Sequence, residues 1–264
     1  MSSPLPRPRT APDLWVCHLG RVPYAHGVAI QTLLRERRLA GELPDTLLLL
    51  EHPPVYTRGR RAGAEDLPLG ADFYRAKGIE VQATDRGGKV TYHGPGQLVG
   101  YPIMASDDVL SHLRTMEGAI VQALAEWGVA ARSRAAEGID YTGVWVGERK
   151  IASIGVHLSR GVTTHGFAVN VDLDLEPFSW VVACGLPDVQ MTSLAAELGG
   201  ERAPAVSCFR KEMAYRFCQA HGRRQRLVSP ARLGIEETPS ISGAPRGAEP
   251  IQRRSAADRE GVPA

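Results

Sequence analysis

One glycine-rich run, residues 86–101 with the sequence RGGKVTYHGPGQLVGY, constrains this chain more than any other segment. It holds five glycines and one proline among Arg, Thr, Tyr, His and Gln, whereas a simple turn needs one or two such residues. Because glycine adopts positive φ angles and lets a backbone approach a ligand closely, this composition is typical of a chain that wraps a small molecule. The polar residues would orient that molecule. The alternative is a plain connecting loop.

Two nucleotide-binding motifs are excluded by the spacing of this run. A Walker phosphate-binding loop needs a glycine five residues before Gly-Lys-Ser/Thr, but Ala83 stands there and Val90 follows Lys89. The dinucleotide motif needs a glycine three residues after Gly96, where the chain has Val99. The run is therefore not predicted to bind a nucleotide.

The length allows one large globular domain or two small ones. The chain has 264 residues, of which 43% are hydrophobic and 23% charged, ordinary values for a folded protein in water. No apolar run approaches the length of a membrane span, and no apolar segment directly follows the two arginines of residues 1–12. We therefore expect a cytoplasmic protein with a flexible N-terminus over residues 1–12 and no membrane partner.

The net charge of +2 is concentrated at the end of the chain. Residues 222–264 hold eight arginines against five acidic residues, so the rest of the chain is close to neutral. Domains that bind nucleic acid usually carry a clustered basic face, so no nucleic-acid partner is expected. Residues 222–264 are also rich in Pro, Gly, Ser and Arg without period, which predicts a disordered, dispensable tail.

A local basic cluster is formed by Arg58, Arg60 and Arg61. Such a cluster is most often a solvated loop. The functional interpretation is a docking patch for an acidic carrier protein, which would raise the association rate more than the affinity.

The four cysteines show no paired spacing of the kind that binds a metal. Cys17 lies on a predicted strand, and Cys208 and Cys218 lie on a predicted helix, so these three are expected to be small core residues. Cys184 differs, because Gly185 and Pro187 place it in a loop where a thiol can be exposed.

The hydrophobic pattern predicts helices and strands in mixed order. Helices are expected over 24–39, 72–77, 108–127 and 204–221, and strands over 13–19, 46–50, 79–83, 98–103, 143–146, 150–158 and 163–171. Gly147-Glu148 is typical of a hairpin turn, which places Lys150 at the start of a strand. This order indicates an α/β or α+β fold, a single domain with a mixed sheet flanked by helices.

Several segments together resemble the signature of one enzyme family. The glycine-rich run is joined, in matching order and spacing, by KIASIG at 150–155, THGFAVN at 164–170 and ACGL at 183–186, with EHPPVYT at 51–57 similar to the family's first loop. Residues 13–221 thus resemble the lipoyl(octanoyl) transferases, which move octanoyl from octanoyl-acyl carrier protein to protein lysines. The resemblance implies a biotin/lipoate protein ligase-like fold and a catalytic domain over 13–221, and it does not cover 222–264.

The resemblance also implies the site residues and partners. The family's cysteine–lysine dyad falls on Cys184 and Lys150, 34 positions apart. Gly155 and Gly166 would leave room for the acyl chain, with Tyr92 and Phe167 as walls. The full implied substrate site comprises Arg86, Gly87, Gly88, Lys89, Val90, Thr91, Tyr92, His93, Ser153, Ile154, Gly155, Gly166, Phe167 and Ala168. The implied acceptors are lipoyl domains of 2-oxoacid dehydrogenase E2 subunits and the glycine cleavage H protein. We expect a monomer without cofactor or metal.

The chemistry of these residue types is consistent with such a dyad. A free thiol, with a pKa of about 8.5, is only a few per cent thiolate at neutral pH, and a nearby cation raises that fraction. An acceptor lysine, with a pKa of about 10.4, needs a base, and Lys150 could serve once acylation removes the thiolate charge. His93 or His165 is the alternative partner for Cys184. Backbone amides near 87–88 or 184–185 could stabilise the oxyanion.

Three other functions stay open at this point. The first is an ATP-dependent lipoate or biotin ligase of the same fold, which would need no nucleophilic cysteine. The second is an amidotransferase that moves an acyl group between two lipoyl-bearing proteins. The third is a non-catalytic module that binds acyl carrier protein, which would leave the pairing of Cys184 with Lys150 unexplained.

Overall fold

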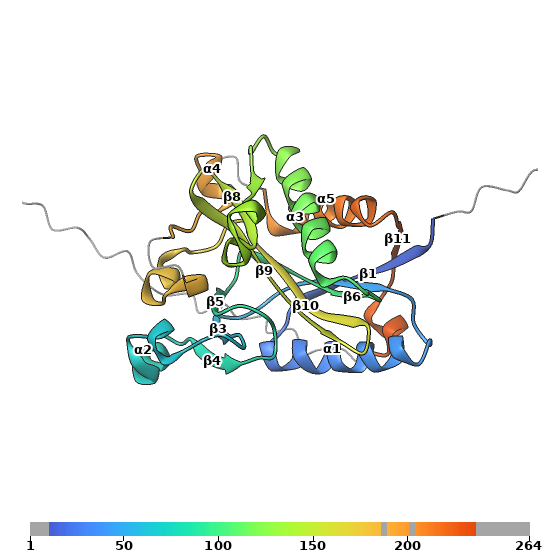
Figure 1. Ribbon diagram of the computed structural model, residues 1–264, viewed down its shortest axis with the longest axis horizontal. Helices are drawn as coiled ribbons and strands as arrows, with labels where there is room; N and C mark the ends of the chain where they lie inside the picture. Colours follow the sequence, from blue (N-terminus) through green and yellow to red (C-terminus); the bar gives the residue numbers. More distant parts are fainter. Residues whose placement is uncertain (1–10, 186–188, 201–203, 236–264) are drawn as a thin grey trace, which may run out of the picture.

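The computed structural model describes residues 11–185, 189–200 and 204–235 (Figure 1). Its centre is an eight-stranded mixed sheet with the order β11-β1-β2-β6-β10-β9-β8-β7, and a three-stranded sheet of order β4-β3-β5 lies beside it. The strands are β1 Asp13–Arg21, β2 Thr46–Glu51, β3 Val55–Arg58, β4 Glu80–Ala83, β5 Val90–His93, β6 Gln97–Ile103, β7 Arg132–Ser133, β8 Gly143–Val146, β9 Arg149–Ser159, β10 Val162–Asn170 and β11 Arg224–Leu227.

Helices cover both faces of the large sheet (Figure 1). The α-helices are α1 Tyr24–Leu39, α2 Gly70–Ala76, α3 Val109–Ala125, α4 Leu194–Glu197 and α5 Val206–Ala220. Short 3-10 helices are η1 Ala64–Asp66, η2 Ala135–Glu137, η3 Ile139–Tyr141, η4 Glu176–Trp180, η5 Ala183–Gly185 and η6 Pro230–Leu233. The predicted fold class, a mixed sheet flanked by helices, is confirmed.

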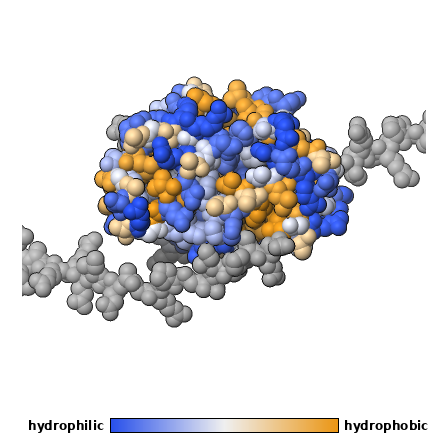
Figure 2. All heavy atoms as spheres, turned by 90° about the horizontal axis from the view of Figure 1, so that it is seen from below, coloured by the Kyte–Doolittle hydropathy of each residue, from blue (hydrophilic) through white to orange (hydrophobic). Residues whose placement is uncertain are grey.

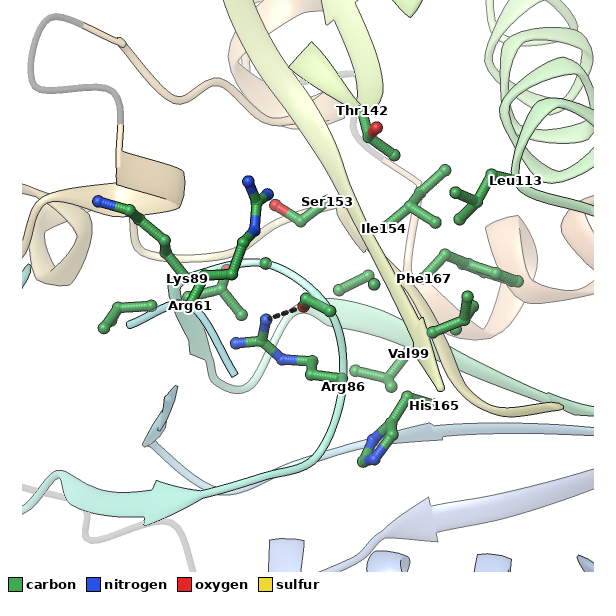
Figure 3. Close-up of a pocket in the computed structure, with 18 of the residues that line it drawn as sticks. Arg61, Arg86, Lys89, Val99, Leu113, Thr142, Ser153, Ile154, His165 and Phe167 are labelled. Atoms are coloured by element: carbon green, nitrogen blue, oxygen red, sulfur yellow. Dashed lines mark hydrogen bonds between the residues drawn. The ribbon is translucent and has the colours of Figure 1, made fainter. Parts of the chain in front are cut away.

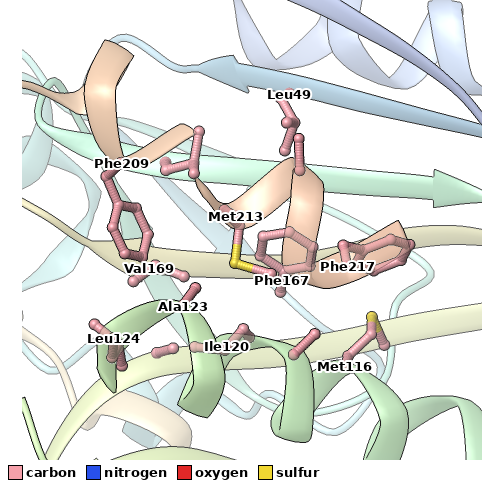
Figure 4. Close-up of a cluster of buried hydrophobic side chains, with 14 of the residues drawn as sticks. Leu49, Met116, Ile120, Ala123, Leu124, Phe167, Val169, Phe209, Met213 and Phe217 are labelled. Carbon is pink, nitrogen blue, oxygen red and sulfur yellow. The ribbon is translucent and has the colours of Figure 1, made fainter. Parts of the chain in front are cut away.

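The main core lies between the large sheet and the helices α3 and α5 (Figure 4). Ile120 and Leu124 of α3, Met213 and Phe217 of α5, and Phe167 of β10 are all buried there. A second core lies between the sheet and α1. Because both faces are covered, every residue of β10 is buried, including the polar residues Thr163, Thr164, His165 and Asn170.

On the opposite side of the molecule, where α1 runs, hydrophobic and hydrophilic residues are mixed across the surface (Figure 2). Helix α1 buries Ile30 and Leu34 against the sheet and keeps Leu33 exposed. Arg37 and Arg38 in its last turn oppose the negative end of the helix dipole, which is a favourable placement. The helix therefore follows from its own sequence pattern.

Most predicted elements are confirmed with small changes at their ends. Helix α1 has the predicted bounds, as does strand β8, and the hairpin at Gly147-Glu148 joins β8 to β9. Helix α3 is shorter than predicted, because Asp108 is its N-cap, accepting hydrogen bonds from Leu110 N and Ser111 N. The short strands β3 and β5 were not predicted, since glycine and proline on either side gave these segments the composition of loops.

The predicted disorder of residues 222–264 is wrong for its first part. Arg224–Leu227 forms β11, which pairs in parallel with β1 at the edge of the large sheet. Leu233 and Ile235 are buried in the core beside α1. An exposed edge strand needs only backbone pairing, so its polar sequence carries no hydrophobic pattern to detect. Residues 236–264 lie outside the described residues.

The expected burial of the cysteines is confirmed at two of three positions. Cys17 and Cys218 are buried, and burial raises the pKa of both thiols, to about 11 for Cys17 and about 12 for Cys218. Cys208 is exposed, because it lies on the solvent side of α5.

Candidate active site

A cavity of about 290 Å³ lies where the small sheet meets the large one (Figure 3). Its walls come from the glycine-rich loop and β5, from β6, β9 and β10, and from the start of α3. The lining residues are Tyr24, Arg61, Arg86, Gly87, Gly88, Lys89, Val90, Thr91, His93, Val99, Tyr101, Val109, Leu110, Leu113, Ile139, Asp140, Thr142, Lys150, Ser153, Ile154, Gly155, Val156, His165, Gly166, Phe167 and Ala168.

All predicted substrate residues line this cavity except Tyr92, and Lys150 lines it as well. Strand β5 alternates, so Tyr92 turns away from the cavity into a separate cluster, where its ring packs on Tyr56 and Phe178. Phe167 is a wall of the cavity, as expected, and Tyr92 is not.

The sequence led us to expect that Gly155 and Gly166 leave room for the acyl chain. Instead, both glycines allow a neighbouring backbone to pack closely against them. A Cβ at Gly155 would lie 2.9 Å from Gly87 O, so this glycine admits the glycine-rich loop. At Gly166 a Cβ would lie 2.2 Å from Gly100 O on the neighbouring strand β6. Both residues shape the cavity by bringing its walls together.

The glycine-rich loop is fastened through its backbone and through Arg86. Gly87 N donates to Val156 O at 3.0 Å, and Arg61 N donates to Gly88 O at 3.1 Å. The Arg86 guanidinium donates from Nη2 to both the carbonyl and the hydroxyl oxygen of Thr57, each at 2.7 Å. Arg86 therefore holds its own loop against β3 and is fixed in the cavity wall.

A buried hydrogen-bond chain continues from Thr57 through His93. Gln97 donates from Nε2 to Tyr92 O and Asn170 Oδ1, so its Oε1 accepts from His93 Nδ1 at 2.7 Å. His93 Nε2 is then an acceptor and lies 3.4 Å from Thr57 Oγ1. Burial, with His52 nearby, holds the pKa of His93 well below its ordinary value. Both ring nitrogens of His93 are engaged and its pKa is lowered, which argues against His93 as the base.

His165 has a structural role in the cavity wall. Its φ of 57° is unusual for a residue other than glycine, and Gln31 Oε1 accepts from its backbone N at 2.6 Å. Its Nε2 lies 2.7 Å from Asp85 Oδ1, which ties β10 to the start of the glycine-rich loop. Burial lowers the pKa of His165 despite the opposing effect of Asp85.

Lys150 is the second residue of β9 and is buried, with 2% of its surface exposed. Its Nζ lies 5.1 Å from the centre of the Trp145 ring, a favourable place for a cation. Lys150 N donates to Gln190 O, and Thr192 N donates to Lys150 O, both at 2.9 Å. The segment that follows the Cys184 loop thus pairs with the backbone of Lys150.

The backbone of Cys184 lies in η5, which packs against β5. The next residue, Gly185, approaches the glycine-rich loop so closely that a Cβ there would lie 2.2 Å from Lys89 Cδ. The side chain of Cys184 lies outside what the structure describes. Its contact with Lys150 therefore stays a prediction.

The opening of the cavity joins Arg61 of the predicted basic cluster to residues that the sequence did not point to. Arg61 Nη1 pairs with Asp140 Oδ1 at 2.8 Å, and both side chains are about half exposed. Leu110 and Ile139, also lining residues, are 53% and 51% exposed. No signal in the sequence could have found Ile139 or Asp140, because η3 reaches the cavity only through the tertiary fold.

Two classes of feature are absent from the described residues. No helix in ranges 11–185, 189–200 and 204–235 is long and apolar enough to cross a membrane. In the same ranges, no group of three His, Cys, Asp or Glu residues could hold a metal ion.

Known proteins resemble this chain in sequence. The model of the lipoyl protein ligase A/B catalytic domain family matches residues 23–218. An octanoyltransferase of Acidobacterium capsulatum is 41% identical over 224 residues, which cover 78% of this chain and 89% of that protein. An octanoyltransferase of Solibacter usitatus is 51% identical over 182 residues, or 67% of this chain and 80% of that protein.

Solved structures resemble it in fold. A putative lipoate protein ligase from T. acidophilum superposes with a TM-score of 0.65 at 20% identity, over 82% of this chain and 88% of that one. A lipoate-protein ligase A bound with ATP gives a TM-score of 0.63 at 18% identity, over 85% of this chain and 92% of that one. The predicted biotin/lipoate protein ligase-like fold is thereby confirmed.

Proposed function

The chain belongs to the octanoyltransferases, within the lipoyl protein ligase A/B catalytic domain family, and we propose that it carries the octanoyl group as a thioester on Cys184. It is an acyltransferase of lipoate biosynthesis. The proposed donor is octanoyl-acyl carrier protein, and the proposed acceptors are lipoyl domains of E2 subunits and the glycine cleavage H protein. The observation that carries the proposal is the buried Lys150, which lines the same cavity as the glycine-rich loop.

In the first proposed step the Cys184 thiolate attacks the thioester of the donor. A bond forms between Sγ and the acyl carbon, the bond from that carbon to the carrier sulfur breaks, and the carrier thiolate leaves. Because one thioester replaces another, the step needs no ATP. Lys150 would supply the positive charge that favours the attacking thiolate.

In the second proposed step a lysine ε-amine of the acceptor attacks the acyl-enzyme. An amide forms, Cys184 leaves as a thiolate, and a base takes the surplus proton. Lys150 is the proposed base. In the first step it gives its proton to the departing carrier thiolate, because acylation of Cys184 removes the negative charge that stabilises the protonated lysine, and in the second step it takes a proton from the attacking amine. Conversion of a thioester to an amide is downhill, which drives the cycle forward.

The cavity suits a molecule with an apolar tail and a polar head. Leu113, Ile154 and Phe167 lie together on one side of it, while Arg61 and Lys89 lie on the other (Figure 3). Its volume of about 290 Å³ is at the small end of the range for ligand pockets. An acyl chain of medium length fits this division, with its carbonyl toward the polar side.

The polar side of the opening is also the proposed docking point for the carrier. Arg60 and Arg61 are exposed beside the cavity, and Arg58 is partly exposed. The Arg61–Asp140 ion pair is exposed, so it contributes little stability and exchanges easily for a new partner. An acidic protein surface would be attracted to this cluster.

The intact mass of the denatured protein after mixing with octanoyl-acyl carrier protein tests the proposal. The wild type is expected to gain one octanoyl group, and Cys184→Ser is expected to gain none. Cys208→Ser is the matched control, because it removes an exposed thiol on α5 and should still be acylated. An unmodified wild type with an active donor would overturn the thioester mechanism.

A further inference from the structure

Thr91 carries a buried hydroxyl that has no hydrogen-bond partner. It is the second residue of β5, is 6% exposed and lines the cavity. Within the described part of the chain, Thr91 Oγ1 is one of eleven buried side-chain polar atoms without a hydrogen-bond partner. A buried hydroxyl in this state destabilises the fold, since it has given up its bonds to water. Because this hydroxyl belongs to a residue that lines a cavity, a bound ligand atom could supply its missing hydrogen bond.

The threonine directly opposite shows the usual arrangement. Thr57 of β3 pairs with Thr91 across the small sheet and is fully buried. Its hydroxyl accepts from Arg86 at 2.7 Å and lies 3.4 Å from His93 Nε2. The two residues share type and sheet, but only Thr91 is among the lining residues of the cavity. The protein therefore satisfies one hydroxyl and leaves the other, on a residue that lines the cavity, without a partner.

Thr91 lies on the strand that packs against the segment carrying Cys184, and it lines the same cavity as Lys150. Strand β5 packs against η5, which carries Cys184. Gly185 approaches Lys89, two positions before Thr91, so that a Cβ would lie 2.2 Å from Lys89 Cδ. Lys150 lines the same cavity. A reacting carbonyl held near Cys184 would thus lie near this strand.

We propose that the Thr91 hydroxyl donates a hydrogen bond to the carbonyl oxygen of the bound acyl thioester. This inference rests on the proposed function. An octanoyl thioester has one strong hydrogen-bond acceptor, the carbonyl oxygen, and the remainder of the acyl group is hydrocarbon. The hydroxyl can therefore be satisfied by the acyl group only at the atom where the reaction takes place.

The hydrogen bond strengthens as the reaction proceeds. When Cys184 Sγ bonds to the acyl carbon, the carbonyl electron pair moves onto the oxygen, which becomes negative. A hydrogen bond to a charged acceptor is stronger than one to a neutral acceptor, so Thr91 stabilises the transition state more than the bound substrate. The carbonyl re-forms as the carrier thiolate leaves, and Thr91 keeps its proton throughout.

The test compares acylation rate with thermal stability in Thr91→Val, which removes the hydroxyl and keeps the β-branched shape. The rate of octanoyl-enzyme formation at saturating octanoyl-acyl carrier protein is expected to fall on the order of 100-fold. The half-saturating donor concentration should change much less. The Tm should stay at or above that of the wild type, because an unsatisfied buried group has been removed. Thr91→Ser should restore most of the lost rate.

Thr57→Val is the matched control for stability, since it removes a hydroxyl that the protein does satisfy, and its Tm should fall. The inference is overturned if Thr91→Val is acylated at the wild-type rate, or if its Tm falls as far as that of Thr57→Val. A wild type that forms no octanoyl-enzyme would overturn the proposed function instead, so the two failures are distinguishable.

Discussion

At the scale of single residues, Gly143 makes room for Lys150. It has a φ of 136°, and a Cβ there would lie 2.7 Å from Lys150 Cε and 2.4 Å from Ala152 O. The lysine can therefore be buried over Trp145 because Gly143, two positions before Trp145 on β8, has no side chain to displace it. The sequence suggested the importance of Lys150 and not that of Gly143.

Gly143→Ala is expected to lower both stability and the rate of acylation, because the added methyl group displaces Lys150. Gly138→Ala is the control: it has a similar φ of 124°, and a Cβ there would meet nothing within 4 Å. Backbone strain of about 1–3 kcal/mol is common to both changes. Rates measured on the two folded variants should differ at least 10-fold (on the order of 1.4 kcal/mol); equal rates would contradict this account.

At the scale of elements, the last strand completes the edge of the large sheet. Strand β11 pairs with β1, and Arg224 donates to Asp13. The following η6 brings Leu233 into the core beside α1. The sequence predicted that everything after His221 is dispensable, and these contacts lead us to expect the opposite for residues 222–235.

Truncation after His221 is expected to destabilise the protein by about 2–5 kcal/mol, since it removes β11 and the buried Leu233 and Ile235. Truncation after Ile235 is the control, because it removes none of the contacts described here. Urea denaturation of the two proteins measures the difference. Equal midpoints would show that β11 contributes nothing to the fold.

At the scale of the whole molecule, the two sheets meet at a cavity whose opening is basic on one side and apolar on the other. Arg61→Glu is expected to lower kcat/KM for octanoyl-acyl carrier protein several-fold, with the loss diminishing at high salt. Arg75→Glu on α2 is the control, since Arg75 is exposed and does not line the cavity. A small octanoyl thioester should serve both variants alike. If Arg61→Glu lost the same kcat/KM with the small donor, Arg61 would act in the chemical step and not in docking of the carrier protein.

Burial of neutral histidines is expected to make the molecule sensitive to acid. Burial lowers the pKa of both His52 and His112 to about 4, against 6.5 for an exposed histidine. The unfolded chain then binds more protons between these values, so stability is present above pH 6.5 and is lost as the pH falls toward 4. Each residue accounts for about 1–2 kcal/mol at pH 5. His112→Phe should flatten the fall of Tm between pH 7 and pH 5; an unchanged slope would contradict this.

The sequence by itself determined most of the regular helices and strands and the family. Helix α1 and strands β8 to β10 follow from hydrophobic periodicity and turn residues. These signals involve residues close together in the chain, so they can be recognised in the sequence alone. The glycine-rich run likewise marked nine of the residues that line the cavity. The dyad of Cys184 and Lys150, the cytoplasmic location and the monomeric state stay predictions.

Only the tertiary structure decided which side chains face the cavity and which hold it together. Tyr92 turns away because β5 is a strand, and strand pairing depends on β3, which is far away in the chain. Thr57 and Thr91 look alike in sequence, yet one is bound by Arg86 and the other borders the cavity. Hydrogen-bond partners and burial arise from residues brought together by folding, and no local pattern encodes them.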